Sequence, residues 1–203
     1  AMAAANAIAA RMYPAGGRVV DEQGQAVEML TDRLNKRMAE KAEAEGCSAV
    51  VLYCFSDPAA EACRERLQIP VIGGAQAALM MAALQGKRIG VILTDPGRIP
   101  EKEWFLRTLG IASDRIASIE AISFAGHSIW KERDAALHLL IEKGKEMKET
   151  RHVDVLIPGC LSFLGLGEAL SDAVGLPVID PAVAAVTLAE SCARQRQKAG
   201  FSI

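Results

Sequence analysis

Two cysteines occupy matching places in two similar stretches of the chain. The first stretch, VVLYCFSDPAAEACRERLQIPVI, carries Cys54, and the second, VLIPGCLSFLGLGEALSDAVGLPVI, carries Cys160. Each cysteine follows an apolar segment. A Pro-Val-Ile sequence begins 16 residues after the first cysteine, at Pro70, and 17 after the second, at Pro177. This repetition indicates two similar structural units with thiols in equivalent positions.

A matched pair of thiols suits the inversion of a stereocentre. A racemase acting on a carbon acid needs a base on one face of the carbon atom and an acid on the other, so one thiolate and one thiol serve both directions. Cysteine is suited to this role because its pKa, ordinarily roughly 8.5, is lowered at helix N-termini, and acid-base catalysis is most efficient when the pKa lies near the working pH. We therefore predict Cys54 and Cys160 as the catalytic pair.

The planar carbanion formed by such a reaction needs hydrogen-bond donors. Backbone N–H groups from Ser56 to Asp57 and from Leu161 to Phe163 are the predicted donors. The negative charge of Asp57 opposes the lowering of a nearby thiol pKa.

The other candidate metal or catalytic residues show no comparable pattern. Cys47, Cys63 and Cys192 have no matched positions, and free cysteine is often a buried packing residue. The five cysteines are odd in number and contain no Cys-x-x-Cys pair, and the three histidines have no matched spacing. We predict no metal site and no disulfide framework. His127 follows a predicted strand, where it is either a cleft residue or simply exposed.

Composition excludes several classes of protein. The 203 residues are 51 % hydrophobic and 24 % charged, and 23 Lys and Arg against 25 Asp and Glu give a net charge of -2. With no basic run, nucleic acid is not an expected partner. The apolar runs stop well short of the roughly 20 residues that span a bilayer, and the beginning of the chain lacks the apolar core of a signal peptide. The prediction is a cytoplasmic protein without membrane contact.

The order of the elements predicts an α/β fold with parallel sheets, because apolar β-branched runs alternate with segments of helical period. Asp57 is the predicted N-cap of a helix with Pro58 at its first position, and Asp180 the predicted cap of the last helix. Strands are predicted over 48–53, 69–72, 87–93, 116–124, 153–158 and 177–180. Helices are predicted over 2–13, 22–45, 57–67, 73–85, 100–109, 129–151, 167–174 and from 181.

The cysteines are placed where such folds bind ligands. Open parallel sheets bind ligands beyond the carboxyl ends of their strands, and each cysteine belongs to a loop of that kind. We expect two lobes, one formed by residues 1–85 with the C-terminal helix 182–203 and one by residues 86–181. Two such lobes related by a pseudo-two-fold axis present one thiol to each side of a substrate in the cleft between them.

The segments CFSDPAAEACRERLQIPVIG and GCLSFLGLGEALSDAVGLPVIDPAVAAVTLAE resemble the Asp/Glu/hydantoin racemase superfamily, and within it the hydantoin racemases. The resemblance covers most of the chain from about Glu45. It implies two pseudo-symmetric α/β lobes, racemisation of a small molecule without a cofactor, and catalytic cysteines at Cys54 and Cys160. It also implies a homo-oligomer.

The residues after the cysteines bear on the substrate. Amino-acid racemases of the superfamily follow the first cysteine with Asn-Thr and the second with Thr. This chain has Phe55-Ser56 and Leu161-Ser162 instead, which favours a neutral ring, a 5-substituted hydantoin or a related cyclic ureide such as allantoin. The predicted substrate-binding residues are Phe55, Ser56, Asp57, Leu161, Ser162 and Phe163. Each Phe is either an apolar wall for the ring or part of the core.

Two departures from the family pattern leave alternatives open. Relatives usually open with a strand ending in Asn-Pro-Asn, whereas this sequence begins on what is predicted as the following helix, and Gln76 stands where hydantoin-type relatives tend to carry Glu. The alternatives are an amino-acid racemase, a decarboxylase, a cis-trans isomerase or a non-catalytic ligand-binding relative. Two cysteines argue against the single-cysteine decarboxylases.

Overall fold

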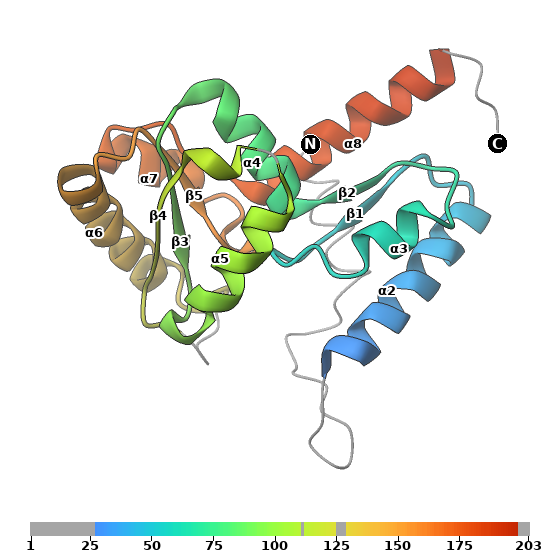
Figure 1. Ribbon diagram of the computed structural model, residues 1–203, viewed down its shortest axis with the longest axis horizontal. Helices are drawn as coiled ribbons and strands as arrows, with labels where there is room; N and C mark the ends of the chain where they lie inside the picture. The colour runs from blue at the N-terminus through green and yellow to red at the C-terminus, as the bar shows by residue number, and fades with distance from the viewer. Residues whose placement is uncertain (1–26, 111, 125–128, 199–203) are drawn as a thin grey trace. The chain divides into compact units, whose positions relative to one another are not determined.

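The structure is a computed structural model that describes residues 27–110, 112–124 and 129–198. The predicted helix over 2–13 and His127 lie outside these ranges. The chain divides into two compact units (Figure 1). The first unit comprises the chain up to Gly74 together with the part from Ala185 onward, and the second is Ala75–Ala184.

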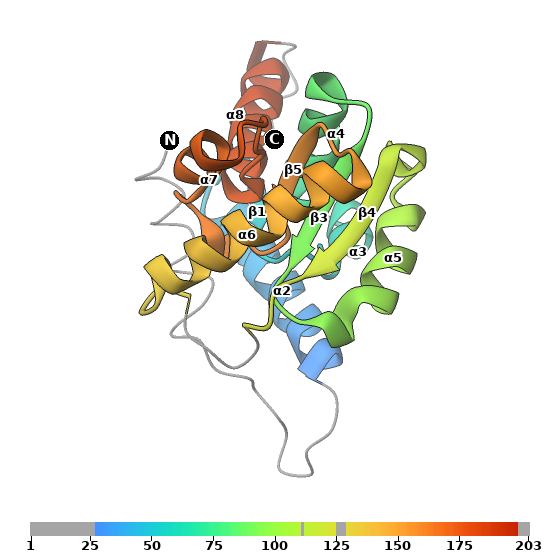
Figure 2. The same ribbon diagram turned by 90° about the vertical axis from the view of Figure 1, so that its left-hand side faces the viewer.

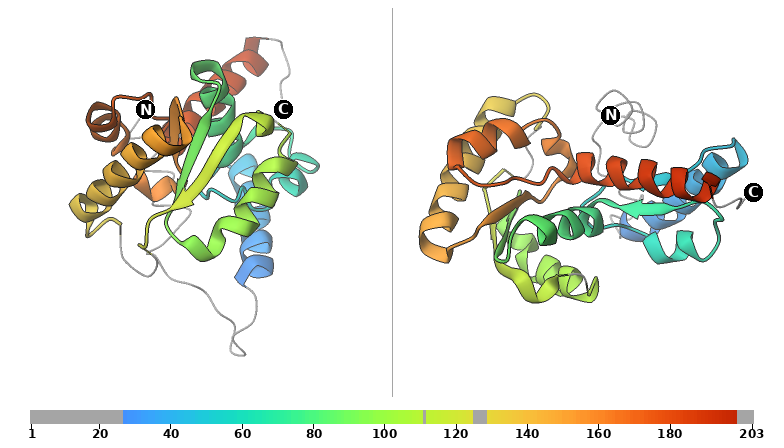
Figure 3. Two further views of the ribbon diagram at one scale, coloured as in Figure 1. Left: turned by 60° about the vertical axis from the view of Figure 1, so that its left-hand side comes forward. Right: turned by 90° about the horizontal axis from the view of Figure 1, so that it is seen from above.

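The first unit is built around two parallel strands. Strand β1 (Val50–Leu52) pairs with β2 (Val71–Gly73), with Val50 opposite Val71. The short helix α3 (Ala60–Arg64) connects them, and α2 (Val27–Ala44) packs against α3 and β1. Figures 1 and 3 show α2 and α3 on one side of the strands and the C-terminal part of α8 (Pro181–Lys198) on the other.

Apolar side chains of these elements form the core of the first unit. All three residues of β1 are buried, as expected for a strand covered on both faces. Cys63 is 1 % exposed within this core and packs as a small hydrophobic residue, as predicted. The buried cluster contains Ala39, Val50, Leu52, Cys63, Leu67, Ile69 and Val71.

The second unit contains three parallel strands in the order β4-β3-β5, with bounds Ile116–Ala121, Ile89–Leu93 and Val155–Pro158. After β3 the chain passes through η1 (Pro96–Arg98), α5 (Ile99–Thr108) and η2 (Ser113–Arg115) to β4, and then through α6 (Arg133–Arg151) to β5. The two crossovers run in opposite directions along the sheet. Because such crossovers are right-handed, α5 and α6 cover opposite faces (Figure 2).

Two further helices complete the layers of the second unit. Helix α7 (Gly167–Val174) packs beside α6, and α4 (Gly74–Gln85) lies on the opposite face of the sheet (Figures 2 and 3). All five residues of β3 are buried, which suits the central strand of a sheet with helices on both faces. No helix within the described ranges is long and apolar enough to cross a bilayer.

The predicted α/β class with parallel sheets is confirmed, and three local expectations can be compared. Asp180 caps α8 as predicted, since its Oδ1 accepts from the backbone N–H groups of Ala182 at 2.9 Å and Val183 at 3.3 Å. The predicted strand 177–180 is reduced to a single bridge between Leu156 and Val178. The η3 turn (Leu161–Phe163) lies directly after Cys160, in a segment for which no element was predicted.

The predicted cap at Asp57 was wrong. Helix α3 begins at Ala60 and is preceded by Ala59, whose φ is 60° and whose side chain makes no cap. Asp57 has φ 44° and is 6 % exposed. Its carboxylate lies against Gly73, where a built Cβ would overlap it. The carboxylate therefore packs at the end of β2, in space that only glycine leaves open.

Candidate active site

The two cysteines sit in turns with the same pattern of backbone hydrogen bonds. The N–H of Cys54 donates to the carbonyl of Leu52 at 2.9 Å, and the N–H of Cys160 donates to the carbonyl of Pro158 at 2.8 Å. The carbonyl of each cysteine accepts from the N–H three residues later, of Asp57 and of Phe163, at 3.1 Å in both cases. The chain thus leaves each strand in the same way and presents a thiol at the same point.

The neighbouring segments repeat the same register. The N–H of Val50 donates to the carbonyl of Pro70 at 2.8 Å, and the N–H of Leu156 donates to the carbonyl of Pro177 at 2.9 Å. Both donors lie four residues before their cysteine. The sequence repeat is therefore a structural repeat, although its second copy is one residue longer between cysteine and proline.

Exposure alternates identically in both turns. Cys54 and Cys160 are partly exposed, as are Ser56 and Ser162 two residues later. The residues between and after them are buried. Each unit therefore presents one thiol and one hydroxyl from the same surface of its loop.

The remaining four predicted substrate-binding residues have buried side chains. Phe55 is 4 % exposed and Leu161 1 %, and Phe163 is fully buried in the core between α6 and α7. Of the two roles predicted for Phe163, a wall of the substrate site or a core residue, the structure shows the core residue. Asp57 packs against Gly73 as described. The backbone N–H groups of Asp57 and Phe163 are already used within the turns.

Cys160 lies at the point where the connections of the second sheet reverse direction, between β3 and β5. Open α/β sheets bind ligands outside the carboxyl ends of strands at such a point. Gly159 brings the loop close to β3, because its N–H donates to the carbonyl of Ile92 at 2.7 Å. A Cβ at Gly159 would lie 2.8 Å from Cδ2 of Leu93, so any larger residue there would force Leu93 to move.

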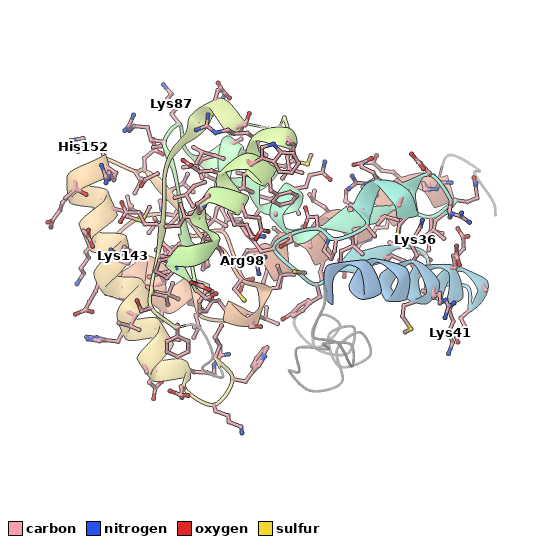
Figure 4. The ribbon with its side chains drawn as sticks, turned by 60° about the horizontal axis from the view of Figure 1, so that its bottom comes forward. Lys36, Lys41, Lys87, Arg98, Lys143 and His152 are labelled. Carbon is pink, nitrogen blue, oxygen red and sulfur yellow. The ribbon has the colours of Figure 1, made fainter. Side chains whose placement is uncertain are left out.

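The loop after β3 reaches the same edge of the sheet and carries an ion-pair network. Arg98 pairs with Glu101 at 2.6 Å, and Lys102, 5 % exposed, lies 3.2 Å from the same carboxylate. Burial raises the pKa of Glu101, but the hydrogen bonds and the positive charges of Arg98 and Lys102 outweigh burial. The pKa of Glu101 is therefore lower than its ordinary value, which favours the ionised carboxylate. Figure 4 shows Arg98 at one end of the second unit and Lys87 and His152 at the other.

Two charged side chains hold the loop after Cys160. Arg133, the first residue of α6, donates from Nη2 to the carbonyl of Leu164 at 2.8 Å. Asp180 accepts from the N–H of Gly165 at 2.9 Å through Oδ2. Sequence reasoning missed Arg133, because a single arginine at the start of a charged helix gives no signal of a contact 31 residues away.

The structure brings together the predicted residues of each loop, with Cys54 in the first unit and Cys160 in the second. The five cysteines, all within the described ranges, form no disulfide with one another. In the described ranges, no three His, Cys, Asp or Glu side chains are arranged to hold a metal ion.

Comparison with known proteins assigns the class and then the family. An allantoin racemase from Klebsiella pneumoniae has the same fold, with a TM-score of 0.78 and 24 % identity over 94 % of this chain and 81 % of that one. A hydantoin racemase from Paenarthrobacter aurescens is 31 % identical over 93 % of this chain and 79 % of its own length. One from Rhizobium meliloti is 34 % identical over 73 % of this chain, which spans 61 % of that relative.

The fold is thus that of racemases. The Asp/Glu/hydantoin racemase family matches residues 7–189. The chain belongs to the Asp/Glu/hydantoin racemase family, and the relatives named above are isomerases.

Proposed function

We propose that this protein racemises a 5-substituted hydantoin or a similar cyclic ureide such as allantoin, with Cys54 and Cys160 as its acid-base pair. The observation that carries the proposal is that the turns at the two cysteines share the same backbone hydrogen bonds and the same exposure pattern. The names of the relatives, hydantoin racemase and allantoin racemase, support this substrate class.

The proposed reaction needs two proton transfers. The thiolate of one cysteine removes the C5 proton, and the electron pair of the C–H bond moves into the ring to form an enolate on the adjacent carbonyl oxygen. The thiol of the other cysteine then delivers its proton to the opposite face of C5. The ring carbonyl accepts the electron pair, so the reaction requires neither metal nor organic cofactor.

The serines and the backbone of the two loops complete the proposed site. In this proposal Ser56 and Ser162 donate to the polar edge of the ring, which their partial exposure beside the partly exposed cysteines supports. Phe55, Asp57, Leu161 and Phe163 would shape the site through the loop backbone, since their side chains are buried. The proposal includes a cytoplasmic homo-oligomer: thiols that form no disulfide in the described residues are typical of a reducing compartment, and the oligomer rests on analogy with relatives.

The test follows proton exchange and inversion together. Single enantiomers of 5-substituted hydantoins and allantoin are incubated with the protein in deuterated water, and optical rotation and the C5 proton signal are recorded against a protein-free control. We expect racemisation coupled to deuterium uptake. Cys54→Ser and Cys160→Ser should each abolish inversion, while the matched controls Cys47→Ser and Cys192→Ser should retain it. Inversion by either of the first two variants contradicts the two-thiol mechanism.

A further inference from the structure

Arg133 has one terminal nitrogen that the fold leaves without a partner. Nη2 of its guanidinium donates to the carbonyl of Leu164 at 2.8 Å, and the guanidinium carbon lies 5.3 Å from the centroid of the Trp130 ring. Nη1 is buried and makes no hydrogen bond to any atom of the described chain. The Nη2 end of the guanidinium is therefore held in place, and the N–H groups of Nη1 have no acceptor within the described chain.

A buried nitrogen of this kind is costly. The guanidinium is always protonated, and each of its N–H groups can only donate. A buried donor without an acceptor destabilises the folded chain, and more so when it is charged. A buried donor without an acceptor requires an explanation. One explanation is that the acceptor is an oxygen atom of a ligand, which would bind to a donor already held in place.

The position of Arg133 connects this donor to the proposed chemistry. Arg133 opens α6, which follows β4, so it lies at the carboxyl edge of the sheet where Cys160 also lies. Its hydrogen bond ends on Leu164, four residues after Cys160. Gly165 follows Leu164 and adopts a φ of 84°, which favours glycine, and Nη2 of Arg133 lies beside it, 3.5 Å from where a Cβ would stand.

We propose that Arg133 is a substrate-binding residue whose Nη1 donates to the ring carbonyl oxygen that becomes the enolate oxygen when C5 loses its proton. This inference rests on the proposed function. The substrate class it implies has a carbonyl next to the acidic C–H group. A preorganised cation beside an oxygen that gains charge strengthens its interaction as the proton leaves. The rate constant therefore depends on Arg133 more than the binding of substrate does.

Trp130 lies against the guanidinium that carries this donor. Its side chain packs on the guanidinium and is 51 % exposed. Exposed side chains change rotamer within nanoseconds, so the indole can turn toward solvent and admit a flat ring. In its place, the ring of the substrate would cover the guanidinium.

The experiment compares Arg133→Lys with a matched control, Arg88→Lys. Arg88 also clamps a backbone segment, donating to the carbonyls of His152 at 3.0 Å and Arg151 at 2.7 Å, but it lies at the opposite edge of the same sheet. Lysine at 133 can keep the bond to Leu164 and the positive charge while it loses the second nitrogen. Melting temperature, kcat and KM for C5 exchange, and calorimetric binding of hydantoin, 5-methylhydantoin and allantoin are measured for both variants.

We expect Arg133→Lys to lower kcat about 100-fold, to weaken binding less, and to keep its melting temperature, while Arg88→Lys exchanges at the wild-type rate. Exchange and binding like the wild type in Arg133→Lys overturn the inference. If that variant does not fold, Arg133→Gln, whose amide N–H₂ can still donate to Leu164, takes its place.

The binding arm separates this inference from the proposed function. Binding that depends on Arg133, in a wild type that shows no exchange, retains Arg133 as a ligand-binding residue but overturns its role at an enolate oxygen together with the racemase proposal. Exchange by the wild type that is unchanged in Arg133→Lys overturns the inference and retains the racemase proposal. A wild type that binds none of the three compounds overturns both.

Discussion

Replacing Gly159 with alanine tests whether the approach of β5 to β3 positions Cys160. The added Cβ would lie 2.8 Å from Cδ2 of Leu93 and 3.2 Å from the carbonyl oxygen of Ile92. Carbon atoms normally pack about 3.5–4.0 Å apart, so Leu93 must retreat by about 0.7 Å or more. Leu93 is 2 % exposed and Ile92 is held by the N–H of Gly159, so neither yields freely. Overpacking of this kind costs about 1–3 kcal/mol.

The same methyl group should move the thiol of Cys160, the proposed catalytic residue. It pushes the end of β5 away from β3, and Cys160 is the next residue. At about 2–4 °C per kcal/mol for a chain of this size, the melting temperature should fall by roughly 2–12 °C. A misplacement near 1 Å costs about 100-fold in rate, so kcat for racemisation at 25 °C, where the variant is still folded, should fall by that order. Differential scanning calorimetry and polarimetry measure the two effects.

Gly167→Ala is the matched control. Gly167 opens α7, and its nearest neighbours would lie 3.5 Å and 3.8 Å from a new Cβ, which is ordinary contact. Alanine there should be neutral or stabilising by about 0.4–1 kcal/mol. A Gly159→Ala protein with the melting temperature and kcat of the control would refute the argument that β3 fixes the position of Cys160.

Two further predictions concern charge and thiol burial. Burial raises the pKa of Glu120, but hydrogen bonds from Arg151, Ser118 and Lys143 and the charge of Lys143 outweigh burial and lower this pKa from its ordinary 4.5. The ionised Glu120 therefore contributes its full stabilisation of the fold above the ordinary pKa, and this stabilisation is lost as the pH falls through the lowered pKa. Glu120→Gln should make the melting temperature less dependent on pH between about 5 and 3, and an unchanged slope would show that these contacts do not contribute. A thiol reagent should modify Cys63 only after denaturation, whereas Cys47, Cys54, Cys160 and Cys192 react in the native protein. Equal rates for all five thiols in native protein would contradict the burial of Cys63.

The parts of the fold that depend on local sequence were predictable. The matched spacing of cysteine and Pro-Val-Ile is enough to predict equivalent turns, because it fixes where a strand ends and where its neighbour begins. Helix α7 and the cap at Asp180 follow from local turn and cap residues. Strand ends were less predictable, and the predicted strand 177–180 contributes only one bridge.

The parts that depend on distant residues were not predictable. Asp57 looks like an N-cap because Pro58 follows it, yet the space at Gly73 draws the carboxylate to β2. The bond from Arg133 to Leu164 spans 31 residues and depends on how α6 enters the second unit. Neither contact has a local pattern, since both follow from the packing of elements that are separate in the sequence.

The two cysteine loops are anchored by carboxylates that come from opposite sides. In the first unit the loop itself supplies Asp57, which rests on Gly73. In the second, Asp180 is supplied by the segment leading into α8 and reaches back to Gly165 in the loop. Gly73 and Asp180 occupy the same position, three residues after Pro70 and Pro177. The loops are therefore not interchangeable modules: grafting the first loop onto the second unit would set two carboxylates against each other, and such a graft requires Asp180→Gly in the same step.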